Sequence, residues 1–266
     1  MRRLGYVRPM PEDPRSKDSG ERVPFGDQHV PADAKSRLVS AVFDNVAHRY
    51  DLMNDIMSGG IHRVWKRRLI NELAVRPPTR LLDLAGGTGD IALRVLRRFA
   101  ESEIEITVCD INLNMLSIGR QRIWDRGYLR QINWLCADGE ALPMPDQSFD
   151  SCTIAFGLRN MTHIERAIAE IYRILQPGGR FLCLEFTPDV APPFRSLYET
   201  YSERVIPKIG DLITGDAEAY RYLVESIRRF PRAQEITLLL EKTGFAGVRA
   251  NKLSLGIATL HSAWRV

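Results

Sequence analysis

The stretch LLDLAGGTGDIALR, residues 81–94, decides the fold class. The apolar run LLDL enters a turn with glycines at 86, 87 and 89, and a helix-compatible segment follows. A strand that turns through glycines into a helix is typical of cofactor-binding α/β domains. Gly87-x-Gly89-x-x-Ala92 also satisfies the dinucleotide fingerprint, and Asp110 lies 21 residues after Gly89, where a ribose-binding acid is expected. The stretch alone leaves a hydride-transfer enzyme and a methyltransferase open.

Alternating strand and helix patterns extend outward from this turn. Apolar runs predict strands at 80–85, 105–110, 132–137, 150–156 and 180–186. Helical spacing predicts helices at 34–57, 61–73, 89–99, 112–125, 163–175, 194–206, 217–229 and 233–245. Strands that alternate with helices form βαβ units in a parallel sheet. Two closely spaced strands, 247–253 and 256–264, then predict an antiparallel hairpin, because a parallel pair needs a long crossover.

Composition and charge exclude several classes of protein. The 266 residues are 44% hydrophobic and 26% charged, with a formal net charge of +4, which is too small an excess to indicate nucleic-acid binding. No apolar run approaches the roughly 18 residues of a membrane span. Residues 1–33 are rich in Pro, Gly and charge and are predicted to be a disordered tail. This tail contains acids and lacks an apolar signal region, which favours a cytoplasmic protein.

Four cysteines, at positions 109, 136, 152 and 183, lie within or at the end of strand-like runs and show no CxxC spacing. We expect buried free thiols, with neither a disulfide nor zinc. His62 and His163 have no partners at metal-ligand spacing, so no metal site is predicted. His163 opens a predicted helix, where a capping or surface role is expected.

Acids lie at the ends of three consecutive strands: Asp83, Asp110 and Asp138, the last followed by Gly139. S-adenosylmethionine carries a carboxylate, an ammonium and a sulfonium. The N–H groups of the turn around Gly87 suit the carboxylate, Asp83 the ammonium, Asp110 the two ribose hydroxyls and Asp138 the adenine amino group. The alternative for each acid alone is that it caps the following helix.

This layout resembles the class I S-adenosylmethionine-dependent methyltransferases. The resemblance implies a single α/β Rossmann-like domain over residues 34–266, with a mostly parallel seven-stranded sheet that ends in an antiparallel hairpin. A two-domain dehydrogenase would need more chain for its substrate half. An NAD-dependent oxidoreductase therefore stays as a rival that is supported by the fingerprint and Asp110.

Three further stretches narrow the resemblance. They are YDLMNDIMSGGIHRVWK (50–66), FGLRNMTHIERAIAEIYRILQPGGRFLCLEF (156–186) and PKIGDLITGDAEAYRYLVESIRRFP (207–231). With the glycine turn they resemble the ubiquinone/menaquinone biosynthesis C-methyltransferase family over residues 36–266. The family implies C-methylation of a polyprenylated quinol, either 2-methoxy-6-polyprenyl-1,4-benzoquinol or demethylmenaquinol, without a metal. Its cofactor positions match Thr88, Asp110 and Asp138-Gly139.

The loop Phe156-Gly157-Leu158-Arg159-Asn160 follows the fourth strand of the predicted sheet and faces the methyl group in this fold. A quinol carbon becomes nucleophilic when an adjacent hydroxyl loses its proton. We expect Arg159 to stabilise the phenolate and Asn160 to orient a water that accepts the proton. The alternative is that Arg159 forms a structural ion pair.

The resemblance also suggests partners. Residues 34–77 are predicted to form a helical acceptor-pocket segment, in which Tyr50, Met53, Met57 and Trp65 either line the pocket or form plain core. The basic runs 66–68 and 228–229 suit lipid headgroups or a solvated helix face. We therefore expect peripheral contact with the inner membrane surface, and a quinone-synthesis complex or a homodimer. A non-catalytic cofactor-binding subunit and a methyltransferase for another small molecule are the remaining rivals.

Overall fold

The computed structural model describes residues 20–46, 50–73, 75, 77, 79–100, 102–128, 132–201 and 217–266. The strands of the main sheet are β3 (Thr79–Leu84), β4 (Ile104–Asp110), β5 (Ile132–Cys136), β6 (Phe149–Ala155), β7 (Leu175–Phe186), β8 (Phe245–Leu253) and β9 (Ala258–Arg265). The helices are α1 (Ala32–Val46), α2 (Tyr50–Ser58), α3 (His62–Glu72), α4 (Asp90–Arg98), α5 (Leu113–Trp124), α6 (Ile164–Ile174), α7 (Pro192–Thr200), α9 (Ala217–Arg229) and α10 (Ala233–Thr243).

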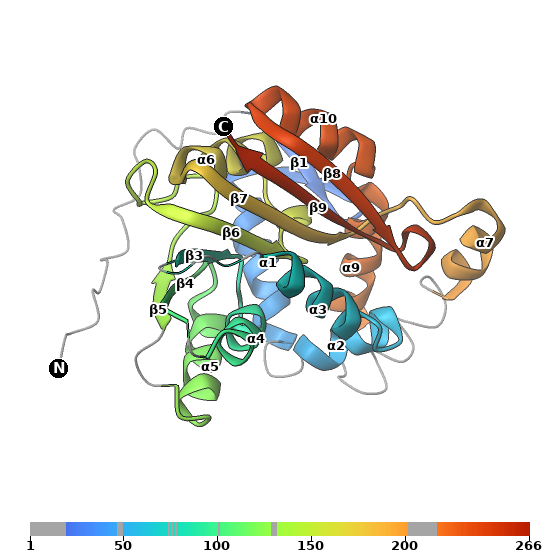
Figure 1. The fold of residues 1–266 in the computed structure, drawn as a ribbon. Coiled ribbons are helices and arrows are strands. Elements are labelled where there is room, and N and C mark those ends of the chain that lie inside the picture. Colours follow the sequence, from blue (N-terminus) through green and yellow to red (C-terminus); the bar gives the residue numbers. More distant parts are fainter. Residues whose placement is uncertain are drawn as a thin grey trace.

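The seven strands form one sheet in the order β5-β4-β3-β6-β7-β9-β8 (Figure 1). The pairs from β5 to β7 are parallel, whereas β9 is antiparallel to both β7 and β8. The predicted parallel sheet and its final antiparallel hairpin are therefore confirmed. The strand order changes direction at β3 and β6, and ligands of open α/β sheets bind beyond the carboxyl ends of strands at such a point.

The sheet is buried on both faces because its central strands are continuously apolar. In β3, Leu81 contacts one core cluster and Leu82 and Leu84 the other, since successive side chains point to opposite faces. Helices α3 and α4 cover the first face and α6 and α10 the second (Figure 1). Met53, Met57 and Trp65 belong to the first cluster, each at most 3% exposed, so they are core residues. The side chain of Tyr50 lies outside the described residues.

The N-terminal region differs from the expected disordered tail. Residues 1–19 lie outside the described residues, but β1 (Arg22–Phe25) and β2 (Gln28–Pro31) form an antiparallel hairpin. The Asp27 side chain at the hairpin's turn pairs with Arg228 and Arg229 of α9. This partner lies about two hundred residues away in the sequence, so local composition could not predict the hairpin.

Cysteine burial follows position in the sheet. Cys109, Cys152 and Cys183 are buried free thiols, as predicted, and burial raises the pKa of each. Cys136 is exposed, which corrects the prediction. The reason is that Cys136 is the last residue of β5, the strand at the edge of the sheet.

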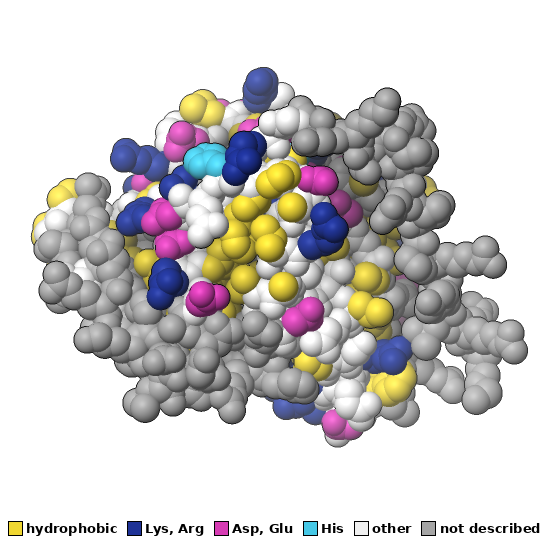
Figure 2. All heavy atoms as spheres, turned by 180° about the vertical axis from the view of Figure 1, so that it is seen from behind, with side chains coloured by type: hydrophobic (Ala, Val, Ile, Leu, Met, Phe, Trp, Pro, Cys, Tyr) yellow, Lys and Arg dark blue, Asp and Glu magenta, His cyan; other side chains and the backbone are white. Residues whose placement is uncertain are grey.

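The surface shows apolar and charged side chains on the same face. Figure 2 shows the side opposite to that of Figure 1, with hydrophobic side chains gathered near its centre and side chains of both charges around them. None of the described helices combines the length and apolar character that a membrane crossing requires.

Candidate active site

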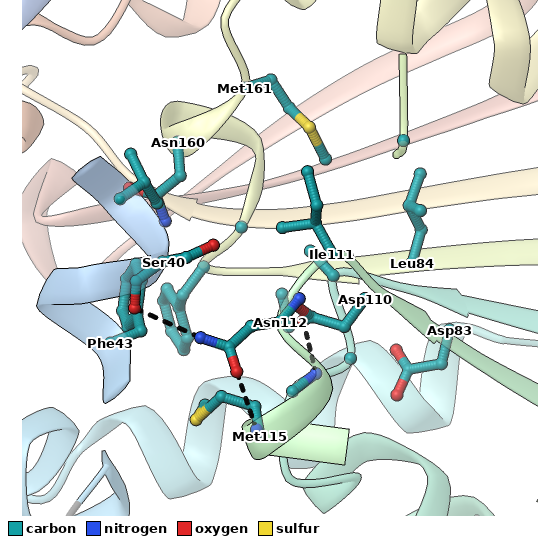
Figure 3. Close-up of a pocket in the computed structure, with 18 of the residues that line it drawn as sticks. Ser40, Phe43, Asp83, Leu84, Asp110, Ile111, Asn112, Met115, Asn160 and Met161 are labelled. Atoms are coloured by element: carbon teal, nitrogen blue, oxygen red, sulfur yellow. Dashed lines mark hydrogen bonds between the residues drawn. The ribbon is translucent and has the colours of Figure 1, made fainter. Parts of the chain in front are cut away.

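A cavity with an empty volume of about 1040 Å³ lies at the carboxyl ends of β3, β4 and β6. This volume includes space that is open to solvent at the mouth of the cavity. The turn after β3, the loops after β4, β5 and β6, and one side of α1 line it. Figure 3 shows Ser40 and Phe43 of α1 facing Asp110 and Asp83 across the cavity.

The glycine turn takes backbone conformations that L-residues rarely adopt. Gly87 has φ 50° and Gly89 has φ 71°, and α4 begins directly after Gly89. A Cβ atom on Gly89 would lie 2.9 Å from the Trp134 ring. Ala85 also has a positive φ of 51°, which is strained backbone of the kind that concentrates at functional sites. Gly87 and Thr88, two residues that were predicted to bind a cofactor, line the cavity.

Asp83 lines the cavity as a buried carboxylate, one oxygen of which is unsatisfied within the described part of the chain. The residue is fully buried, and its Oδ1 accepts a hydrogen bond of 2.9 Å from Thr153 Oγ1. Its Oδ2 is a buried oxygen with no hydrogen-bond partner among the described residues. Burial raises the pKa of Asp83 to about 7. A buried, half-satisfied carboxylate is costly, and a bound ammonium would supply the missing partner.

Asp110 holds the glycine turn in place. Its Oδ2 accepts from the backbone N–H of Gly87 and its Oδ1 from that of Asn112, both at 2.8 Å. Burial raises the pKa of Asp110, and hydrogen bonds from backbone N–H groups partly offset this. A carboxylate has about four lone-pair sites, so this residue can still accept from a ligand in the cavity.

The loop after β5 closes the far end of the cavity. Asp138 is exposed, lines the cavity and accepts at Oδ1 from the backbone N–H of Glu140 at 2.9 Å. Gly139 is buried, and a Cβ there would lie 2.8 Å from Met161 Cε. Asp110 and Asp138 therefore both accept local backbone hydrogen bonds, as turn-forming acids do, and both also line the cavity.

Helix α1 forms a wall that the sequence did not identify residue by residue. Val39, Ser40 and Phe43 line the cavity. Asn112 ties this helix to the start of α5, because its Nδ2 donates to the Ser40 carbonyl at 3.2 Å (Figure 3) and to Asp44 Oδ1 at 2.9 Å. The apolar spacing of residues 34–57 predicted a helix here, but it could not show which side faces a ligand.

Lys66 is a further cavity residue that sequence reasoning missed. Its side chain is 3% exposed, its Nζ lies 2.9 Å from Asp90 Oδ2, and it sits 5.6 Å from the centre of the Phe156 ring. Burial alone would raise the pKa of Asp90, but Lys66 and Arg94 hold it well below its usual range. Lys66 therefore does not face lipid headgroups, and Arg228 and Arg229 are already engaged with Asp27.

The loop after β6 separates the two predicted catalytic residues. Asn160 is half-buried and lines the cavity. The Arg159 side chain is 1% exposed and pairs with Glu185, with Nη1 2.6 Å from Oε1. Arg159 is absent from the lining of this cavity. This is the structural ion pair that the sequence left as an alternative, and burial raises the pKa of Glu185 despite its cationic partner.

Both histidines have structural partners. His163 precedes α6, and its Nδ1 lies 3.2 Å from Glu140 Oε2. His62 is buried, and its Nε2 lies 2.8 Å from Asp55 Oδ1. Burial lowers the pKa of His62, with a further contribution from Lys66. Neither histidine lines the cavity.

Known proteins resemble the chain over most of its length. A family model described as the ubiE/COQ5 methyltransferase family matches residues 31–265. The chain is 53% identical over 246 residues to "Ubiquinone/menaquinone biosynthesis C-methyltransferase UbiE" of Methylobacterium nodulans, covering 91% of this chain and 96% of that protein. It is 48% identical over 255 residues to the mitochondrial "2-methoxy-6-polyprenyl-1,4-benzoquinol methylase" of Arabidopsis thaliana, covering 90% of this chain and 88% of that protein.

A solved structure supports the fold. The chain resembles a SAM-dependent methyltransferase from Aquifex aeolicus with a TM-score of 0.52 and 16% identity, covering 76% of this chain and 89% of that one. At this identity the likeness concerns the fold alone, which is that of the class I methyltransferases. The match of the family model over nearly the whole chain, together with the close relatives, establishes that the chain belongs to the ubiE/COQ5 methyltransferase family.

Proposed function

We propose that the protein transfers a methyl group from S-adenosylmethionine to a ring carbon of a polyprenylated quinol, either 2-methoxy-6-polyprenyl-1,4-benzoquinol or demethylmenaquinol. The family and the names of its relatives support the reaction class. The observation that carries the assignment to this cavity is the buried Asp83 Oδ2, which has no partner among the described residues and lies beside a strained glycine turn.

The residues around the cavity fit each part of the cofactor. Asp83 would accept from the ammonium, and Thr88 at the start of α4 would receive the carboxylate, because the Gly87 N–H already donates to Asp110. Asp110 would accept from the ribose hydroxyls, and Asp138-Gly139 would meet the adenine. A dinucleotide would instead place a pyrophosphate at the glycine turn, beside the buried Asp83, whose oxygen without a partner among the described residues would oppose an anion. This arrangement disfavours the NAD-dependent alternative.

Bound S-adenosylmethionine supplies an electrophilic methyl group on positively charged sulfur. Asp83, Asp110 and the glycine turn would hold the cofactor so that this methyl group reaches the ring carbon, which would lose its own proton in exchange. Phe43 and Phe156 would exclude water from the reacting atoms and hold them in line. Asn160 would contact the reacting hydroxyl. Arg159 would act through the loop that its pair with Glu185 fixes, since this geometry favours positioning over the direct phenolate contact that the sequence suggested.

The acceptor's prenyl chain needs an apolar exit. Three exposed apolar side chains are lining residues or their immediate neighbours in the sequence: Leu38 on α1, Ile111 before α5, and Leu113 at its start, which are 37%, 42% and 64% exposed. We propose that this rim meets the inner membrane surface and passes the prenyl chain to the lipid. Membership of a quinone-synthesis complex or a homodimer stays a prediction from the family resemblance.

The proposal is tested by incubating purified protein with methyl-labelled S-adenosylmethionine and reduced short-chain benzoquinol or naphthoquinol acceptors, followed by mass analysis of the products. The expected result is label on a ring carbon of at least one acceptor. Cofactor binding without label on either ring would favour a non-catalytic subunit or a different acceptor. NAD binding without S-adenosylmethionine binding would favour the NAD-dependent oxidoreductase instead.

A further inference from the structure

The loop after β6 is fixed by side chains from three other elements. Arg159 pairs with Glu185 of β7. Lys35 of α1 donates from Nζ to the Met161 carbonyl at 2.8 Å. Tyr222 of α9 donates from its hydroxyl to Asn160 Oδ1 at 3.1 Å. Among these contacts, that of Tyr222 reaches a side chain that lines the cofactor cavity.

The N-terminal hairpin packs around Tyr222. The side chain of Phe25 in β1 stacks on the Tyr222 ring with centroids 4.6 Å apart and an interplanar angle of 28°. The backbone N–H of Asp27 donates to Glu225 Oε2 at 2.9 Å, and the Asp27 carboxylate engages the two arginines at the end of α9. Tyr222 itself is 6% exposed. The hairpin and α9 thus leave its hydroxyl few orientations other than the one towards Asn160.

This contact places Oδ1 of the Asn160 amide against Tyr222. Burial raises the pKa of Tyr222 well above its usual range, so the hydroxyl stays protonated and can donate. An amide carries one oxygen and one NH₂ group. With Oδ1 engaged by Tyr222, Nδ2 remains for a ligand, and Figure 3 shows the Asn160 side chain extending towards Ser40 and the cavity.

We propose that Tyr222 is a positioning residue that orients the Asn160 amide so that its N–H, and not its oxygen, meets the reacting quinol hydroxyl. In this orientation Asn160 stabilises the developing phenolate as a hydrogen-bond donor. The opposite orientation would make Asn160 an acceptor that positions a proton-accepting water. The inference rests on the proposed function and assigns the chemistry of one of its contacts.

The first test compares Tyr222→Phe with Tyr172→Phe as a matched control. Tyr172 donates to the Val266 carbonyl at 3.3 Å, and its ring packs against Phe245, away from the cavity. Tyr222→Phe is expected to lower kcat about tenfold with an unchanged Kd for S-adenosylmethionine. Tyr172→Phe is expected to leave kcat unchanged. Thermal unfolding and cofactor titration establish that each variant is folded.

A double-mutant cycle shows whether Tyr222 acts through Asn160. Asn160→Ala is expected to lower kcat about 100-fold, as loss of a phenolate donor does. Adding Tyr222→Phe to that variant should then lower kcat by less than twofold. A further tenfold loss in the double variant would show that Tyr222 acts independently, and would overturn the inference.

Asn160→Asp separates the donor from the acceptor role. Tyr222 can still donate to one carboxylate oxygen, while an anionic oxygen replaces the N–H that faces the cavity. The donor role predicts a loss of kcat at least as large as that of Asn160→Ala. Retained or increased kcat would establish an acceptor and contradict the proposal. If the wild type methylates neither quinol, the proposed function is wrong. If the wild type is active but the effects of Tyr222→Phe and Asn160→Ala on kcat are additive, only this inference is wrong.

Discussion

The two sides of the cavity handle charge in opposite ways. On the glycine-turn side, Asp83 and Asp110 end strands with carboxylate oxygens directed at the cavity, and one of these oxygens has no partner among the described residues. On the β6 side, the charges of Arg159 and Glu185 neutralise each other inside the protein, and the amide of Asn160 faces the cavity. The first side is suited to holding a cation, and the second to shaping the acceptor's position.

This comparison predicts that substitutions on the two sides fail differently. Changes on the β6 side that break the buried pair should lower stability. Changes at the strand-end acids should lower cofactor affinity while the fold is retained.

The largest effect is expected for Arg159→Met. Removing one partner of a buried ion pair leaves Glu185 uncompensated, which costs about 3–5 kcal/mol in the free energy of unfolding. Urea denaturation of the unliganded protein measures this. The double variant Arg159→Met/Glu185→Gln should recover part of the loss. A loss below about 1 kcal/mol would show that the pair does not fix this loop.

Asp83→Asn should weaken S-adenosylmethionine binding about 30-fold. A hydrogen bond to a charged group contributes roughly 1.5–3 kcal/mol, and the amide retains the contact with Thr153 but loses the charge. The free energy of unfolding should change little, because the substitution removes a buried carboxylate that is itself costly. Calorimetric titration measures the affinity. Unchanged binding would mean that the ammonium sits elsewhere.

Cofactor affinity should also depend on pH, because the pKa of Asp83 is raised to about 7. The ionised form binds the ammonium, so affinity should rise about fivefold from pH 6 to pH 7. The unliganded folded state binds this proton more tightly than the unfolded state, so the stability contribution of Asp83 falls as pH rises from about 4 to 7. Asp83→Asn should abolish both slopes, and titration at several pH values checks this.

The smallest effect concerns the rim of the cavity. Leu113→Ser should weaken binding to anionic phospholipid vesicles two- to threefold, since less apolar surface enters the interface. Leu238→Ser on α10, at an exposed leucine of similar exposure, serves as the matched control. Vesicle sedimentation measures both. Equal losses of vesicle binding in the two variants would show that the rim does not contact the membrane.

The sequence predicted the sheet and the glycine-turn side well because their signals are local. The run 81–94 contains a strand, its turn and the next helix, and three acids lie at the ends of three strands at the same edge of the sheet. The final hairpin followed from the short connection after residue 253. These features depend on neighbours within a few residues.

The β6 side could not be predicted because its partners are distant along the chain. Glu185 lies 26 residues after Arg159 and Tyr222 62 residues after Asn160. The sequence places Lys66 in a basic run that suggested an exposed helix face, yet its pairing with Asp90 makes it a cavity residue. The N-terminal hairpin was predicted to be a disordered tail because its stabilising contacts come from the distant helix α9. In each case tertiary contacts decided the role of a residue whose local sequence suggested another.

The central claim is that this cavity binds S-adenosylmethionine through Asp83 and transfers its methyl group to a quinol ring. The most direct test is the labelled-methyl assay run on the wild type and on Asp83→Asn over a range of cofactor concentrations. The account predicts ring label with the wild type, and the same kcat with a roughly 30-fold higher KM for the cofactor in the variant. Equal KM values, or no ring label from a wild type that binds the cofactor, would contradict it.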